Sequence, residues 1–144
     1  RTEVEATGAT YSYQRLSHRI APAPAEIKRY LKKGQVACLT CLHLADGAPF
    51  QLEERWISLT GVPAAQSETF ETISPNEWLV TEVPFTDVEI SFSAQAAPEQ
   101  VAARLGQNAG SPVFVTERAT WAAGVFITYA RLSHPHTYRM TAQY

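Results

Sequence analysis

The amino-acid sequence predicts an α+β domain built on an antiparallel sheet, with short helices packed around it. Long runs rich in β-branched and aromatic residues are joined by turn residues suited to hairpins. Helical patterns occupy only short segments between these runs, so helices can cover a sheet but cannot form the core alone. The chain has 144 residues, of which 45% are hydrophobic and 18% charged, as is typical of one globular domain.

The first half of the chain contains three predicted strands and one short helix. A strand over Thr10 to Ile20 ends at a proline-rich segment, and a helix is expected from Ala25 to Lys32. Two further strands, Gln35 to Leu44 and Phe50 to Leu59, are expected to pair around a turn at Asp46-Gly47.

A strong helix start follows at Ser74, because Ser74, Pro75 and Glu77 occupy the N-cap, N1 and N3 positions. We expect this helix to end near Val83.

The second half contains up to three further strands and another helix. A strand is expected over Thr86 to Gln95, and a helix from Pro98 to Gly106. A second hairpin joins Val113–Trp121 to Val125–Ser133 through a three-residue loop, and Tyr138–Tyr144 forms a possible last strand. The total is five or six strands and three short helices.

Charge excludes one class of function for these residues. The formal net charge is -2, and no basic stripe is present, so the chain does not have the charge of a free-standing nucleic-acid binder. Any action on DNA requires a part outside these residues. Because the sequence starts at Arg1 without a methionine, we expect it to be a piece of a longer chain. No apolar run is long enough to span a membrane.

Cys38 and Cys41 have the spacing of a redox motif or of half a zinc site, but lie in a predicted strand with no second ligand pair. Their side chains then point to opposite faces of the sheet. We interpret them as small buried hydrophobic residues of a cytoplasmic, reducing environment, and we expect no metal and no cofactor.

The first hairpin carries the most informative polar residues. Alternation places Glu53 and Arg55 on one face of their strand and Glu54 on the other. A two-residue turn puts Glu54 on the face of Cys41 and His43, whereas a three-residue turn pairs residue 41 with residue 53. The second arrangement gathers an acid, a base and a neutral ring, which suits a small polar ligand. The alternative is an ordinary cross-strand salt bridge on a solvated face.

Other candidate residues lie on the helix start and on the second hairpin. Ser74 at a helix N-terminus can bind an anion, or it can simply cap its own helix. A three-residue loop places Arg118 opposite Thr128, although Arg118 can equally pair with a nearby carboxylate. Tyr129 and Tyr138 are either ligand contacts or rim aromatics.

The sequence gives little support for catalysis. His43, His134 and His136 have no serine or cysteine partner in a recognisable nucleophile motif, and no glycine-rich phosphate loop is present. We therefore expect no catalytic residue and no enzyme activity.

A series of short motifs follows one another along the chain: His43–Pro49, Leu52–Arg55, Pro63, Ser74–Leu79, Ala102–Leu105, Gly110–Val113, Glu117–Trp121, Tyr129–Arg131 and Tyr138–Met140. In this order and spacing, the motifs resemble the effector-binding (UTRA) domain of GntR-type transcription regulators of the HutC subfamily. The resemblance runs from about Tyr11 almost to the end, and its specificity comes from the order and spacing of the motifs.

The resemblance implies a chorismate-lyase-like fold, a homodimer, and an effector-binding and dimerisation role for residues 1–144. It also implies that operator DNA is bound only through an N-terminal winged helix-turn-helix domain that this chain lacks. A metabolite bound in the effector domain would change the spacing of the two DNA-binding heads.

The resemblance also implies a binding site. The returning acid matches Glu53, the serine at the helix start matches Ser74, the polar position of the second hairpin matches Thr128, and the closing tyrosine matches Tyr138. The loop before Tyr138 is one residue shorter than the family pattern, which weakens that match. Phosphosugar-sensing members have arginines where this chain has Cys41 and His43, which argues against a phosphate effector.

Within the subfamily the chain is most similar to the regulators of histidine utilisation, whose effector is urocanate, an imidazole joined to an acrylate. Glu53 can then accept an imidazole N–H, and the carboxylate can use Ser74 with the helix N-terminus, His43 or Arg118. The alternatives are a sensor of another small carboxylate and a chorismate-lyase-like enzyme. The enzyme would need arginines near Cys41 and His43 to hold two carboxylates.

Overall fold

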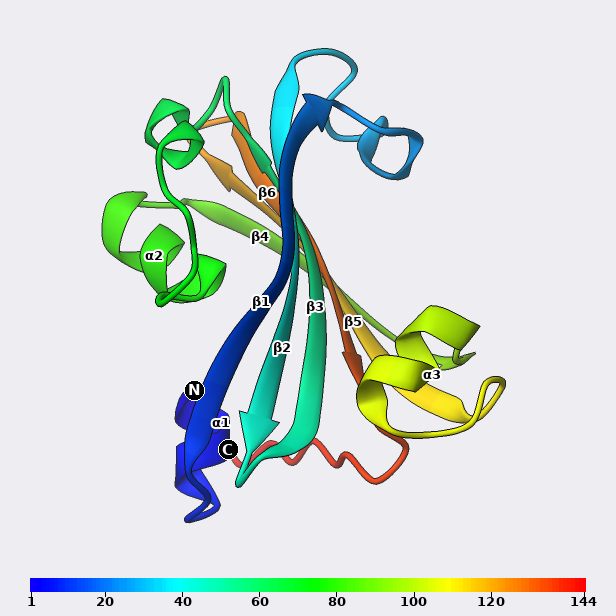
Figure 1. Cartoon of the computed structure of the whole chain (residues 1–144). Helices are drawn as coiled ribbons and strands as arrows, with labels where there is room; N and C mark the ends of the chain where they lie inside the picture. The colour runs from blue at the N-terminus through cyan, green and yellow to red at the C-terminus, as the bar shows by residue number, and fades with distance from the viewer.

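The computed structural model describes residues 1–144, and its centre is one six-stranded sheet with the order β1-β2-β3-β6-β5-β4 (Figure 1). All neighbouring strands are antiparallel, which confirms the predicted α+β class. Each predicted strand up to residue 134 is present within two residues at either end. The strands are β1 (Tyr11–Pro22), β2 (Gln35–Ala45), β3 (Ala48–Ser58), β4 (Asp87–Ala96), β5 (Pro112–Ala122) and β6 (Val125–His134).

The hairpin of β2 and β3 combines features of both predicted arrangements. Its turn has two residues, Asp46 and Gly47, and both have the positive φ of a tight hairpin turn. A bulge next to the turn adds Phe50 to β3, so that Cys41 faces Glu53 across the hairpin. The extra residue produces the pairing that we expected from a three-residue turn, and it places Glu53 on the same face of the sheet as His43.

The predicted three-residue loop between β5 and β6 is wrong. Only Ala123 and Gly124 form the turn, and a bulge lies between Thr120 and Trp121 of β5 and their partners on β6. Arg118 therefore pairs with Ala130 and not with Thr128. Since the shift is two residues, Arg118 and Thr128 still lie on the same face.

The helix starting after Ser74 and the helix ending at Gly106 are confirmed as α2 (Pro75–Glu82) and α3 (Glu99–Leu105). Gly106 has the left-handed conformation that ends α3. Two short elements were not predicted: the helix α1 (Thr2–Ala6) and the 3-10 turn η2 (Pro63–Gln66).

The predicted helix over Ala25 to Lys32 is wrong, because only a 3-10 turn, η1 (Ala25–Ile27), forms there. Beyond η1 the chain places the Tyr30 ring on Phe126 and Tyr129, with ring centroids 5.6 and 5.3 Å away. This aromatic packing outweighs the weak helical preference of a short segment.

The predicted strand over Tyr138 to Tyr144 is also wrong. The chain leaves β6 in the middle of the sheet, where both neighbours of β6, β3 and β5, are already paired. Tyr138 instead stacks on His134, with ring centroids 3.8 Å apart, and the two ends of the chain lie close together (Figure 1).

The two faces of the sheet have separate cores. On the first, which we call the cavity face, η2, Phe70 and α2 pack over Cys41 and Ile57. On the opposite face, the η1 segment and α3 cover two clusters, one of which contains Cys38. The two cysteines are free and buried on opposite faces, as predicted. None of the helices has the length and apolarity needed to cross a membrane.

Phe70 fixes the segment that leads into α2. Its side chain is fully buried and meets the Trp78 ring edge-on at 5.5 Å. The hydroxyl of Tyr13 donates to the Phe70 carbonyl at 2.7 Å. Phe70 also has a φ of +56°, a strained conformation for a bulky residue that persists only when packing holds it in place.

We predict that Phe70→Ala lowers the free energy of unfolding by about 3–5 kcal/mol, because it leaves a cavity under α2. Urea titration followed by circular dichroism measures the change. Met140→Ala removes a half-exposed side chain and should change stability by less than about 0.5 kcal/mol. Equal effects of the two substitutions would contradict an anchoring role for Phe70.

Candidate functional site

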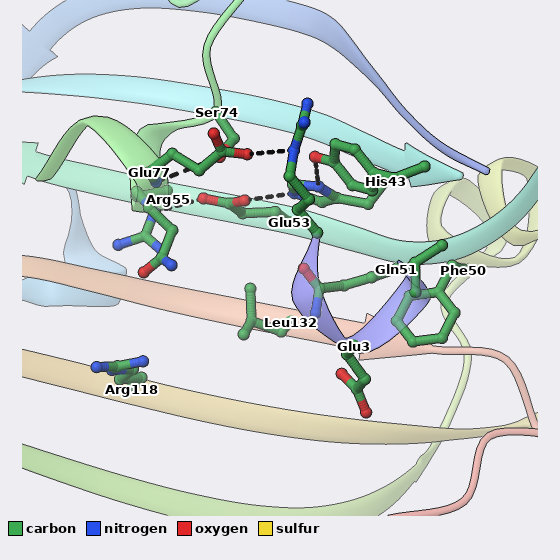
Figure 2. Close-up of a pocket in the computed structure, with 14 residues that line it drawn as sticks. Glu3, His43, Phe50, Gln51, Glu53, Arg55, Ser74, Glu77, Arg118 and Leu132 are labelled. Carbon is green, nitrogen blue, oxygen red and sulfur yellow. Dashed lines mark hydrogen bonds and ion pairs between the residues drawn. The ribbon is translucent and has the colours of Figure 1, made fainter. Parts of the chain in front are cut away.

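A cavity of about 260 Å³ opens on the cavity face, between the strands and the two helices α1 and α2 (Figure 2). Its size suits a small molecule. The strands contribute Tyr11, His43, Phe50, Gln51, Glu53, Arg55, Arg118 and Leu132. The helices and their flanking residues contribute Arg1, Glu3, Val4, Ser74, Asn76 and Glu77.

A chain of buried polar groups forms the floor of this cavity. His43 Nε2 lies 2.7 Å from Glu53 Oε1, and Arg55 Nε donates to Glu53 Oε2. The Tyr11 hydroxyl is 2.7 Å from His43 Nδ1, and Arg55 Nη1 donates to Thr128 Oγ1 at 3.2 Å. Because an ionised carboxylate only accepts, the His43 Nε2 must carry the shared proton. The floor is therefore preorganised before any ligand binds.

Glu53 stays ionised although it is only 1% exposed. Burial alone would raise the pKa of its carboxyl group. The Arg55 guanidinium and the hydrogen bond from His43 outweigh that effect and hold the pKa of Glu53 at about 2. Each carboxylate oxygen has one donor from the protein and keeps a lone pair that can accept another hydrogen bond.

Arg118 is the arginine of this cavity that has no carboxylate partner. Arg1 pairs with Glu77 at 3.1 Å, and Arg55 pairs with Glu53, whereas Arg118 forms no hydrogen bond or ion pair within the chain. Figure 2 shows Arg118 apart from the group around Glu53, on β5, which β6 separates from β3. Burial, together with the nearby Arg55, lowers the pKa of Arg118. An arginine side chain stays protonated at neutral pH despite such shifts, so Arg118 offers a free positive charge.

The simpler roles considered for Arg118 are not observed. The partner of Glu53 is Arg55, and Glu117 pairs with Arg131, whose Nε lies 3.7 Å from Glu117 Oε1. Glu117 and Arg131 lie on the opposite face of the sheet, since both alternate with residues that face the cavity.

Ser74 lines the cavity, but it also caps its own helix, since its Oγ accepts the Glu77 N–H at 3.3 Å. The Trp78 N–H is used by the Ser74 carbonyl, and Pro75 has no N–H. Only the Asn76 N–H remains in this first turn, and Glu77 adds a negative charge to the same turn. The helix N-terminus therefore attracts an anion less than Arg118 does.

Of the six residues proposed from sequence, the structure brings His43, Glu53, Ser74 and Arg118 to one cavity. Thr128 lies behind Arg55 in a small adjoining cavity of about 20 Å³, with its hydroxyl donating to the Trp56 carbonyl. Tyr138 lines a different cavity, and its hydroxyl donates to Glu3.

Several cavity residues were missed or were given no role from sequence. Gln51 and Arg55 could have been found, since alternation puts them on the face of Glu53. Arg1, Glu3 and Val4 line the cavity from α1 and its N-cap. This helix has five residues and no side-chain cap, so the sequence contains no start signal that predicts it.

Comparison with known proteins gives a family match over nearly the whole chain. A sequence model described as the UTRA domain matches residues 6–139. The histidine utilization repressor of Pseudomonas putida is 27% identical over 136 residues, which cover 92% of this chain and 55% of that protein. This chain spans about half the length of the curated relatives it matches.

Solved structures share the fold. The C-terminal domain of the histidine utilization repressor from Pseudomonas syringae pv. tomato matches with a TM-score of 0.86 and 23% identity, over 94% of this chain and 99% of that one. The effector domain of PhnF from Mycobacterium smegmatis matches with a TM-score of 0.80 and 18% identity, over 98% of this chain and 93% of that one.

We predict that Glu53→Gln makes the free energy of unfolding less dependent on pH between about 4.5 and 2. A carboxylate with a lowered folded-state pKa stabilises fully above its ordinary value of 4.5, and this stabilisation disappears as the pH falls toward 2. The size of the shift corresponds to roughly 3 kcal/mol. Urea midpoints between pH 7 and pH 2 should fall steeply for the wild type and less steeply for Glu53→Gln.

Glu82→Gln serves as the control, because Glu82 is an exposed carboxylate of the same type. Its pH profile should follow the wild type. Parallel profiles for the wild type and Glu53→Gln below pH 4.5 would show that ionised Glu53 does not contribute to stability.

Proposed function

The chain belongs to the UTRA domain family, and on that premise we propose that it is the ligand-sensing half of a bacterial transcription repressor of histidine utilisation. The match over residues 6–139 supports the domain type, and the names of the curated relatives support the regulated pathway. These relatives are named as repressors, in line with the expectation of a regulator and not an enzyme.

The effector we propose is urocanate, bound in the cavity of about 260 Å³. The observation that carries this proposal is the unpaired Arg118 on the same cavity as the ionised Glu53. A ligand with a carboxylate at one end and a ring N–H at the other matches this pair of charges. The carboxylate binds Arg118, and the imidazole donates to the free lone pair of a Glu53 oxygen.

Arg118 is a better carboxylate partner than the other groups considered. The first turn of α2 has one free N–H and carries the negative charge of Glu77. Both ring nitrogens of His43 are already engaged, by Tyr11 and Glu53. Arg118 can therefore form an ion pair with the ligand carboxylate without breaking an existing interaction with another charged group.

The same cations disfavour a phosphate effector. A dianion needs more than one free positive charge, and Arg1 and Arg55 are already paired with carboxylates. Cys41 and His43 supply no fixed positive charge comparable to an arginine.

We propose that the sensing domain works as a homodimer and acts on operator DNA through a winged helix-turn-helix domain preceding it. The net charge of -2 supports a DNA contact outside these residues. Urocanate must bind the dimer arrangement unsuited to the operator more tightly than the DNA-competent one, or it shifts nothing.

We predict that millimolar urocanate raises the thermal unfolding temperature of this chain. A ligand at about 100 times its dissociation constant stabilises the folded state by about 2.7 kcal/mol, a rise of several degrees. Histidine, glucosamine 6-phosphate and chorismate, measured in parallel, should give smaller shifts. A shift with one of these compounds but none with urocanate would support a ligand-sensing role and reject urocanate as the effector. No shift with any of the four compounds would contradict the proposed binding site.

We predict that Arg118→Gln weakens urocanate binding about 10- to 100-fold, because a charge-assisted hydrogen bond to the carboxylate is lost. Isothermal titration calorimetry measures the affinity. The amide of urocanate should bind the wild type more weakly than the acid does, but should bind Arg118→Gln with little further loss.

Arg104→Gln is the matched control, since Arg104 is exposed on α3, which packs on the opposite face. It should leave the affinity unchanged. If Arg118→Gln discriminates acid from amide as well as the wild type does, another group holds the carboxylate.

A further inference from the structure

Phe50 stands between the cavity that we assign to the effector and a second cavity. It lines the effector cavity of about 260 Å³, and it also lines a neighbouring cavity of about 350 Å³. Glu3 is the other residue that lines both. The two cavities therefore adjoin at Phe50 and Glu3, whose side chains form the boundary between them.

The neighbours of Phe50 hold its side chain in this boundary. The Phe50 ring lies edge-on to the rings of His134 and Tyr138, with centroids 5.6 and 5.7 Å away. Those two rings stack on each other at 3.8 Å, and the Tyr138 hydroxyl donates to the carboxylate of Glu3. The boundary thus consists of packed aromatic rings and one hydrogen bond.

The register of the strands places Phe50 and Arg118 at different levels of the cavity. Arg118 pairs with Ala130, and Ala130 pairs with Arg55 of β3. Arg55 and Phe50 are five residues apart on β3, which corresponds to roughly 16 Å along the strand. Glu53 lies between these two levels. Figure 2 shows the same order, with Arg118 and Phe50 at opposite ends of the cavity.

A ligand anchored at Arg118 and Glu53 therefore points its ring end toward Phe50. In urocanate, the carbon between the two ring nitrogens is among the atoms furthest from the carboxylate. A substituent on this carbon extends the ligand beyond Glu53, and the first side chain that limits its length is the ring of Phe50.

We propose that Phe50 sets the length of the ligand that this cavity admits, and that it is a specificity-determining residue of the effector site. This inference rests on the effector proposed above, because it takes Arg118 and Glu53 as the two anchors of the ligand. Phe50 admits urocanate and excludes derivatives lengthened at the ring end.

Removal of the Phe50 ring opens the boundary to a ring carried by the ligand. Phe50→Ala leaves a space the size of a phenyl group beside the stacked rings of His134 and Tyr138, and it joins the two cavities. The second cavity is also lined by Pro49 and Pro135, so it offers apolar ring surfaces to the ligand. A phenyl group on the ligand then takes the position of the deleted Phe50 ring.

Isothermal titration calorimetry with two ligands tests this role. The first ligand is urocanate, and the second is 2-benzylurocanate, which carries a benzyl group on the carbon between the ring nitrogens and keeps the carboxylate and the ring N–H. The wild type should bind urocanate more tightly. Phe50→Ala should shift the ratio of the two dissociation constants toward 2-benzylurocanate by about 10-fold or more, because an added apolar group that fits its pocket has an effect of that size.

Leu132→Ala is the matched control. Leu132 is half-buried like Phe50 and lines the effector cavity, but it does not line the second cavity. Its substitution removes apolar volume without opening the boundary, so the ratio of the two dissociation constants should stay nearly unchanged. Phe50→Leu keeps an apolar side chain in the bulge and should shift the ratio in the same direction as Phe50→Ala by a smaller factor, so the test does not depend on the stability of Phe50→Ala.

A ratio that stays at the wild-type value in both Phe50 variants would overturn the proposal, and so would an equal shift in Leu132→Ala. The affinity of the wild type for urocanate is a separate result. If the wild type does not bind urocanate but the Phe50 variants gain 2-benzylurocanate, Phe50 is the boundary residue and urocanate is not the effector. If urocanate binds but neither Phe50 variant gains the longer ligand, the effector stands and the role of Phe50 is rejected.

Discussion

The ionised carboxylate of Glu53, held between Arg55 and His43 inside the sheet, is the constraint on which the candidate site depends. A buried charge is tolerated only with well-placed partners, and removal of one partner leaves the other charge uncompensated. The hairpin of β2 and β3 supplies these partners because its bulge at Phe50 brings Cys41 opposite Glu53 and so places His43 on the same face. Local backbone geometry therefore decides the electrostatics of the cavity.

Around this fixed anion, the rest of the fold leaves one cation free. Arg118 stands on β5, a strand that enters the sheet on the far side of β6, so the two charges of the cavity come from distant parts of the sequence. Residues of α1 and α2 also line the cavity. Arg1, which precedes α1, forms an ion pair with Glu77 of α2, so neither charge is free to bind a ligand. A small ligand with separated negative and donor groups is what this arrangement can select.

The sequence predicted the strands and the facing of Glu53 and Arg55, because strand alternation is a local property. Register was harder: both hairpins have two-residue turns, and a bulge in each one shifts the pairing, which turn residues do not reveal. The same effect moved Arg118 from Thr128 to Ala130. The helix expected over Ala25 to Lys32 failed because packing of Tyr30 overrode local preference. The role of α1 had no local signal, and the partner of each arginine depends on contacts that only the folded chain defines.

A crystal structure of this chain with urocanate tests the central claim most directly. The account predicts that the carboxylate of urocanate lies against the Arg118 guanidinium and that a ring nitrogen lies within hydrogen-bond distance of a Glu53 oxygen. Urocanate bound in the reverse orientation, or away from both residues, would contradict the assignment of these two charges as the determinants of the ligand.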